Sequence, residues 1–350
     1  MKNKNPTIDI VKGLAIILVV YGHVIEHGMV VQGGDYYLNP LFKIIYTFHM
    51  PLFVFISGYL MAFSLSKRSL AGNFKHKCDS LLVPFIFLGS IGIAVSYALN
   101  ILFGNSVGAP NFSQNLLDQL LLKPSVWFLF TLFIMSCLLL YSVNWEKRFG
   151  PAVFLVFYFL IGIIPYKDYG CLYYIKWFYL FFLAGYFMNK YNMKITHKAV
   201  QAGVFLIALF LFIMLMPYWK TQDYIYINKM ALGSTQDVLR LMYRYLMGFL
   251  GIGMVFYIGI LLTKIRQAAF LGVIGRYSLD IYIIQMLIVE GIYPRIAYKT
   301  HSHIDFNSSV GLYVWTGLLV IFFVGLCMLI SKLLIRKNHL LSRLLLGGRL

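Results

Sequence analysis

Charged residues are scarce in this chain: they make up 12% of its 350 residues, where soluble domains average about 25%. Long stretches of Ser, Gly and Pro that would separate soluble domains are also missing. These two absences exclude a soluble multidomain protein. Because 60% of the residues are hydrophobic, we expect one integral membrane domain over residues 1–350.

The cysteines give no sign of cross-links or of a metal site. The four cysteines are scattered singly, without CxxC or CxH spacing, so neither a disulfide framework nor a zinc site is predicted. The His, Asp and Glu residues form no recognisable ligand set, and we expect no metal. The basic, apolar N-terminus lacks a small-x-small cleavage pattern, which predicts a retained first span rather than a signal peptide.

Long apolar runs dominate what remains. A membrane-spanning helix needs about 20 apolar residues, and ten runs approach or exceed this length. They predict an all-α, polytopic bundle of about ten helices, of which the fifth is short: 8–27, 43–65, 80–103, 126–144, 151–165, 173–189, 199–217, 240–262, 270–293 and 309–333.

The net charge of +18 is unevenly distributed between the two sides of these spans. If the N-terminus is cytoplasmic, the inner segments hold eighteen of the thirty Lys and Arg residues. This asymmetry follows the positive-inside rule and predicts that both termini are cytoplasmic. Topology and anionic headgroups therefore explain the basic runs better than a nucleic-acid partner does. Three longer outer segments, 104–125, 217–239 and 294–308, are expected to form an irregular rim over an outward-opening pocket.

The first span carries ionisable residues on one stripe. Lys12 and His23 are eleven residues apart, which returns to within about 20° on a helix and covers about 16 Å. Lys12 and His23 could simply mark the two membrane interfaces. Ionisable groups within a bilayer are nevertheless functional by default. Glu26 follows His23 by three residues and could orient the ring, whereas Asp9 could neutralise a nearby cation.

The second span opens with "FHMPLFVFISGYL", residues 48–60. It runs from outside to inside, so His49 should lie at a depth similar to that of His23. Two imidazoles at one depth supply a general base and a second acid or hydrogen-bonding group. Pro51 is expected in the first turns of the helix, where its missing N–H is tolerated. Ser57 and Gly58 are interpreted as packing residues.

The ninth span contains "LGVIGRYSLDIYIIQMLIVEG". Arg276 and Asp280 stand at i, i+4, and a structural ion pair is the simplest expectation. Alternatively, Arg276 and Lys12 both enter from the cytoplasmic end and could share an anionic ligand. At the outer end of the fourth span, Trp127 could belong to an aromatic belt or stack on a sugar.

These stretches together resemble acyltransferase family 3, particularly its fucose 4-O-acetylase-like bacterial members. The resemblance extends over most of the chain. It is carried by "IDIVKGLAIILVVYGH", "TFHMPLFVFISGYL", "KHKCDSLLVPF", "VWFLFTLF", "FFLAGYF" and "LGVIGRYSLDIYIIQ", in this order and spacing.

The resemblance implies a ten-helix enzyme of the inner (cytoplasmic) membrane. Such an enzyme uses cytoplasmic acyl-CoA, most commonly acetyl-CoA, to acylate a hydroxyl of a surface or envelope glycan. The family's basic residue and histidines fall on Lys12, His23 and His49, and its basic loop on Lys75 and Lys77. Many members have Arg in place of Lys12, and many have a histidine where Gln285 stands.

Together these observations predict how the site is arranged. The CoA phosphates would bind Lys12, Arg276, Lys75 and Lys77, and the acceptor would meet Trp127, Asp280 and Gln285. His23 would act as general base or transient acyl carrier, assisted by His49 and Glu26. The alternatives are a transporter or flippase of a polysaccharide or lipid-linked sugar, and a non-catalytic subunit of a glycan-processing partner. Acyl group, acceptor and any homo-oligomer remain open.

Overall fold

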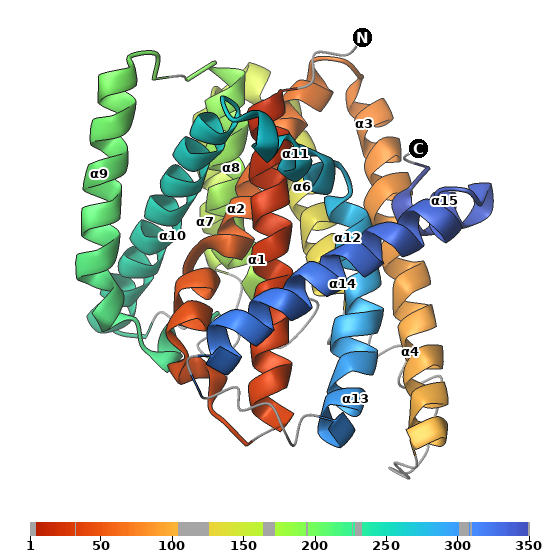
Figure 1. The fold of residues 1–350 in the computed structure, drawn as a ribbon. Helices are drawn as coiled ribbons and strands as arrows, with labels where there is room; N and C mark the ends of the chain where they lie inside the picture. The colour runs from red at the N-terminus through yellow and green to blue at the C-terminus, as the bar shows by residue number, and fades with distance from the viewer. Residues whose placement is uncertain are drawn as a thin grey trace.

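The computed structural model describes residues 5–31, 33–103, 126–163, 172–193, 195–225, 227, 233–300, 308 and 310–348. These residues form helices and connecting turns, with no strand among them, as the hydrophobic runs predict (Figure 1). The α-helices are α1 (Pro6–Val31), α2 (Pro40–Leu65), α3 (Leu70–Lys77), α4 (Val83–Phe103), α6 (Trp127–Phe149), α7 (Ala152–Ile163), α8 (Leu172–Lys190), α9 (Lys198–Leu215), α10 (Thr235–Leu262), α11 (Ala269–Arg276), α12 (Ser278–Leu287), α13 (Tyr293–Thr300), α14 (Thr316–Ile330) and α15 (His339–Leu346).

Each of the ten predicted ranges coincides with helix in the described part of the chain. Seven helices are individually long and apolar enough to cross a membrane, and a bent pair would make an eighth. The shorter α7 and the less apolar α8 account for the other two predicted ranges. The all-α polytopic bundle is therefore confirmed, whereas the count of ten spans stays a prediction.

Helix α1 is the centre of the bundle. It packs against α2, α10, α11, α12, α13 and α14, and α14 crosses it obliquely (Figure 1). Of its apolar window, 61% is buried, against 11% for α9, which stands at the edge and packs on α10. A helix that is apolar on all sides is stable either in a core or in lipid. The polar residues of α1 are thus held among other helices rather than facing the bilayer.

Two glycines allow neighbouring helices of the bundle to pack closely. A Cβ added at Gly275 of α11 would lie 1.8 Å from the carbonyl oxygen of Asp9 on α1, and one added at Gly58 of α2 would lie 1.9 Å from that of Phe182 on α8. Only a residue without a side chain permits such backbone contact between helices. This confirms the packing role expected of Gly58.

Pro51 does not lie in the first turns of its helix, as the sequence suggested. Helix α2 already begins at Pro40, capped by the side chain of Asn39, so that Pro51 is inside the helix. A proline there cannot donate to the carbonyl four residues earlier, which belongs to Thr47. Pro51 therefore deprives the Thr47 carbonyl of its helical donor.

The predicted ninth span is broken. Helices α11 and α12 meet at Tyr277, whose φ of −94° and ψ of 6° are not helical, and the two segments are bent by 61°. This break changes the partners of Arg276 and Asp280, because an i, i+4 pair requires a continuous helix.

The expected outer rim is described only in part. Residues 104–125 lie outside the described residues, as do 226, 228–232, 301–307 and 309. The segment after α9 has two short 3₁₀ turns, Met216–Tyr218 and Thr221–Asp223. The segment from 294 is not irregular at its start, because α13 continues through Thr300.

Candidate active site

The bundle encloses two cavities that meet end to end. The first, which we call the histidine cavity, has a volume of about 320 Å³ and the second, the basic cavity, about 470 Å³. Apart from tyrosines, the titratable residues of the histidine cavity are His23, Glu26, His49, Asp223, Arg244 and Glu290. The basic residues of the basic cavity are Lys12, Lys67, Arg68, His76, Lys77, Arg276 and Arg336. The sequence predicted that Lys12 and His23 lie at opposite ends of one stripe of the helix. In the structure Lys12 lines the basic cavity and His23 lines the histidine cavity.

His23 lies between two carboxylates. Its Nδ1 is 3.6 Å from Oε2 of Glu26, and its Nε2 is 3.3 Å from Oε1 of Glu290. Glu26 lies on the same face of α1, as its i+3 spacing predicts. Carboxylates on both sides fix the orientation of the ring and stabilise the imidazolium that forms when it accepts a proton.

Glu290 was not assigned a role from the sequence, although an acidic residue within an apolar run is a signal for one. It lies in a π-helical turn, Ile288–Ile292, that follows α12, and such turns are frequent at functional sites. Gln285 is fully buried and donates from Nε2 to Oε1 of Glu290 at 3.3 Å. Gln285 therefore supports Glu290 from behind the cavity and is not one of the described lining residues.

His49 lines the same cavity as His23, and the expected convergence of the two imidazoles is what the structure shows. His49 is 4% exposed, and its Nδ1 lies 2.9 Å from the carbonyl oxygen of Ile45. A carbonyl only accepts, so in the neutral ring Nδ1 carries the hydrogen and Nε2 is the acceptor. His49 thus has one nitrogen suited to receive a proton or a hydroxyl hydrogen bond.

Tyr46 connects the two histidine environments. Its ring lies 4.5 Å from that of His49, and its hydroxyl donates to Oε2 of Glu26 at 3.3 Å. One turn of α2 therefore contributes both His49 and a hydrogen-bond donor to the carboxylate beside His23.

Aromatic side chains form most of the remaining wall. Trp127 stacks on Tyr174 with ring centroids 3.9 Å apart and planes at 17°. Tyr36, outside the spans, donates to Tyr37 at 3.0 Å, and its burial, with this hydrogen bond, raises the pKa of Tyr36. The aromatic lining comprises Tyr36, Tyr37, Tyr46, Trp127, Tyr174, Trp177, Phe178, Trp219, Tyr224 and Tyr282. An apolar, aromatic pocket with a few placed polar groups is the usual form of a small-molecule site.

The basic cavity draws its cations from several helices and one turn. Lys12 comes from α1, Lys77 from α3, Arg276 from α11, and Arg336 from the segment before α15. Lys67 and Arg68, between α2 and α3, were assigned only a topological role from the sequence, and they also line it. Lys75, in contrast, is exposed on α3 and is not one of the described lining residues. Asp280 is the only carboxylate among the described residues of this lining.

Arg276 and Asp280 have different partners from those expected. Arg276 Nη1 lies 3.8 Å from Oδ2 of Asp9. Asp280 accepts from Nε of Arg336 at 2.8 Å and from its Nη2 at 3.1 Å, and also from the hydroxyl of Ser331. The bend at Tyr277 separates the two residues that a straight helix would have paired. Asp280 thus holds Arg336 in the basic cavity and is not one of the lining residues of the histidine cavity, although the sequence suggested that it would meet the acceptor.

No group of three His, Cys, Asp or Glu residues in the described ranges is arranged to hold a metal ion. The polar chemistry available in the histidine cavity is that of imidazoles, carboxylates, phenols and one guanidinium.

The fold is a multi-pass helical bundle with histidines, carboxylates and cations around internal cavities, which is the arrangement expected of a membrane protein with a binding site between its helices. The family model "Acyltransferase domain" of acyltransferase family 3 matches residues 5–336. The chain therefore belongs to this acyltransferase family and is an enzyme that transfers an acyl group from a donor to an acceptor. This membership favours the prediction of an enzyme over the alternatives of a transporter and of a non-catalytic subunit.

Two curated relatives are similar to parts of the chain. "Nodulation protein NolL" of Sinorhizobium fredii is 35% identical over 128 residues, which cover 36% of this chain and 33% of that protein. "Nodulation protein NolL" of Mesorhizobium japonicum is 40% identical over 86 residues, 24% of this chain and 23% of that protein. The matches thus span about a third and a quarter of these relatives. No solved structure matches the chain.

Proposed function

We propose that the protein transfers a short acyl group, such as acetyl, from cytoplasmic acyl-CoA to a hydroxyl of a surface or envelope glycan. The observation that carries this proposal is the meeting of the two cavities inside the bundle. One of them is rich in cations and the other holds the histidines, and α1, α2 and α12 contribute residues to both.

The basic cavity would bind the CoA end of the donor. CoA carries several phosphate charges, and Lys12, Lys77, Arg276 and their neighbours surround the cavity with positive charge. Arginine recognises phosphate through a planar pair of donors, and lysine acts as a point charge. Lys12 in place of the arginine of many family members keeps the charge but not the paired donors.

The histidine cavity would bind the acceptor. A sugar ring is flat and largely apolar on its faces, which fits the stacked surface of Trp127 and Tyr174. Its hydroxyls would find acceptors in Glu26, Glu290 and the carbonyl of Thr47 that Pro51 leaves without its helical donor.

The reaction follows from these positions. An imidazole takes the proton of the acceptor hydroxyl while the hydroxyl oxygen attacks the thioester carbonyl. The tetrahedral intermediate expels the CoA thiolate, which receives the proton, so that an ester and free CoA are formed. His23 is the base in this scheme, with Glu26 and Glu290 stabilising its charged form, and His49 assists through Nε2. In the second route, His23 attacks the thioester carbonyl and expels the CoA thiolate. The acceptor hydroxyl, losing its proton to His49, then attacks the acyl-imidazole, which forms the ester and frees His23.

Orientation and location belong to the same proposal. The excess of Lys and Arg on one side supports an orientation with the basic cavity toward the cytoplasm, where acyl-CoA is made, and the histidine cavity toward the outer face. This arrangement corresponds to the inner membrane of a bacterial cell.

The test uses membrane vesicles from cells that carry the protein and make their own acceptor. CoA is too highly charged to cross a bilayer. Inside-out vesicles supplied with [¹⁴C]acetyl-CoA should label the glycan fraction and release CoA, and right-side-out vesicles should not. Equal labelling in inside-out vesicles that lack the protein would refute the proposal.

A further inference from the structure

Three residues, Val19, Met50 and Tyr282, line both cavities, and we call them the neck. They come from α1, α2 and α12, three helices that are far apart in the sequence. Because each of them contacts both cavities, the neck lies where the basic cavity ends and the histidine cavity begins.

The order of residues along each helix supports this position. On α1, Lys12 lines the basic cavity, Val19 both and His23 the histidine cavity, a spacing of seven and four residues on one helical face. On α2, Phe53 lines the basic cavity, Met50 both and Tyr46 the histidine cavity.

Helix α12 and the turn after it repeat this order. Leu279 lines the basic cavity, Tyr282 both, and Glu290 the histidine cavity. On each of the three helices, the lining residues thus pass from the basic cavity to the histidine cavity at the level of the neck.

The neck is composed of an isopropyl group, a thioether and a phenol ring, with no cation among them. A phosphate would lose its hydration there and gain at most a hydrogen bond from a neutral phenol, so the phosphates of the donor are disfavoured. An acyl chain has no such cost. Val19 lies about 6 Å along α1 from His23, at 1.5 Å per residue, so an acyl carbonyl at the neck is close to the base.

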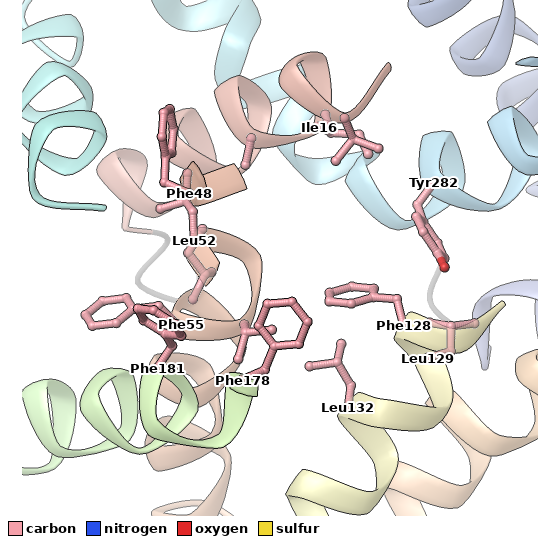
Figure 2. Packing of buried hydrophobic residues seen from close by; sticks show 14 of the residues in the cluster. Ile16, Phe48, Leu52, Phe55, Phe128, Leu129, Leu132, Phe178, Phe181 and Tyr282 are labelled. Atoms are coloured by element: carbon pink, nitrogen blue, oxygen red, sulfur yellow. The ribbon is translucent and has the colours of Figure 1, made fainter. Parts of the chain in front are cut away.

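The neck is also held in place on at least one side. The ring of Tyr282 meets that of Phe128, at the start of α6, edge to face, with centroids 5.5 Å apart, and Figure 2 shows Tyr282 reaching from its helix toward Phe128. Val19 is 3% exposed and, being β-branched, has few side-chain conformations. Met50 is the flexible member, and its unbranched chain fills the remaining space.

From these observations we infer that the neck holds the acyl group of the donor and selects it by size, favouring short acyl chains over longer ones. This inference rests on the proposed function. An added methylene in a closely fitting apolar site changes kcat/KM by roughly 10- to 200-fold. Met50, as the adaptable member, then determines the length limit.

The test measures kcat/KM for labelled acetyl-, propionyl- and butyryl-CoA in inside-out vesicles. The native protein should prefer acetyl to butyryl by at least about tenfold. Met50→Ala and, independently, Val19→Ala should raise the butyryl-to-acetyl ratio by at least about tenfold. The matched control is Met61→Ala, which removes a fully buried methionine from the same helix but outside both cavities. Its acyl preference should remain native.

The outcomes separate this inference from the proposed function. Protein-dependent labelling with none of the three donors would overturn the proposed function itself. The inference about the neck would be overturned if the native protein showed no preference for acyl length. It would also be overturned if Met50→Ala and Val19→Ala, at normal membrane levels, both kept the native preference. A shift in Met61→Ala as large as in Met50→Ala would also overturn it, by attributing the effect to general loosening. Using two neck variants on different helices guards against the misfolding of one.

Discussion

The carboxylate of Glu290 lies 3.3 Å from Nε2 of His23, across the interface between the π-helical turn after α12 and the central helix α1. Glu26 approaches the other ring nitrogen from α1 itself. His23 is therefore oriented by one partner from its own helix and by one partner that arrives only when the tertiary fold forms.

Replacing this second partner tests its contribution to catalysis. Glu290→Gln keeps the size of the side chain but removes the charge that stabilises the imidazolium, so kcat for acyl transfer should fall by about 10²-fold. The KM for acyl-CoA should hardly change, because Glu290 does not line the basic cavity. Initial rates of labelling at several donor concentrations separate the two constants. An unchanged kcat would leave Glu290 with a structural role only.

His23 itself should be indispensable. His23→Ala should insert normally and bind acyl-CoA, while transfer falls by at least about 10²-fold. His23→Gln preserves polarity but cannot take up a proton near neutral pH, and it should be equally inactive. Near-native transfer in His23→Gln alone would mean that the ring only supplies a hydrogen bond. His49, whose Nε2 is an acceptor, would then be the base.

Two lysines of α3 provide a matched pair for the donor site. Lys77 lines the basic cavity, whereas Lys75 is exposed and outside its described lining. Lys77→Ala, like Lys12→Ala and Arg276→Ala, should raise the KM for acyl-CoA by about tenfold, the value of one charged hydrogen bond. Lys75→Ala should leave it unchanged, although the family resemblance pairs it with Lys77. Equal effects of the two lysine variants would point to long-range charge instead of contact.

The contact between α1 and α11 should not tolerate a methyl group. Gly275→Ala would place a Cβ 1.8 Å from the Asp9 carbonyl oxygen, so the helices must separate, and stability should fall by about 3 kcal/mol or more. Gly272→Ala, one turn earlier in α11, has its nearest neighbour at 3.8 Å and should be close to neutral. Thermal unfolding in detergent compares the two. Similar unfolding temperatures would show that α1 and α11 can move apart at little cost.

The orientation of the chain can be measured with reporter fusions. Fusions after His27 and after Leu350 should report the outer and the cytoplasmic side respectively, because Lys and Arg are concentrated on the inner side. Reporters on the same side at both points would require one span to be gained or lost. The short α7, with 12 residues, would be the first helix to re-examine.

The sequence predicts those features that depend on local spacing. The apolar runs mark the helices. The eleven-residue interval on α1 separates Lys12 from His23 by about 16 Å along the helix. The histidine pair follows from the alternating direction of two consecutive spans. These arguments work because neighbouring residues on one helix have fixed relative positions.

Features that depend on tertiary contact could not be derived in this way. Nothing in the hydropathy of 270–293 marks the bend at Tyr277. Without the bend, the i, i+4 spacing would pair Asp280 with Arg276 rather than with Arg336. Gln285 was expected to meet the acceptor, but its amide supports Glu290. The partner of Asp280 comes from a segment distant in the sequence, so packing determines it, whereas the Gln285–Glu290 bond depends on the π-helical turn that follows α12.

The bond between Asp280 and Arg336 has a consequence for how the enzyme matures. Arg336 completes the wall of a cavity that begins with Lys12, so residues from opposite ends of the sequence must meet before that wall exists. All helices from α1 to α14 must have been inserted by then. Under the proposed function, a nascent chain therefore cannot hold its donor in full until α14 has packed against α12, so partly inserted chains would be kept from consuming the donor.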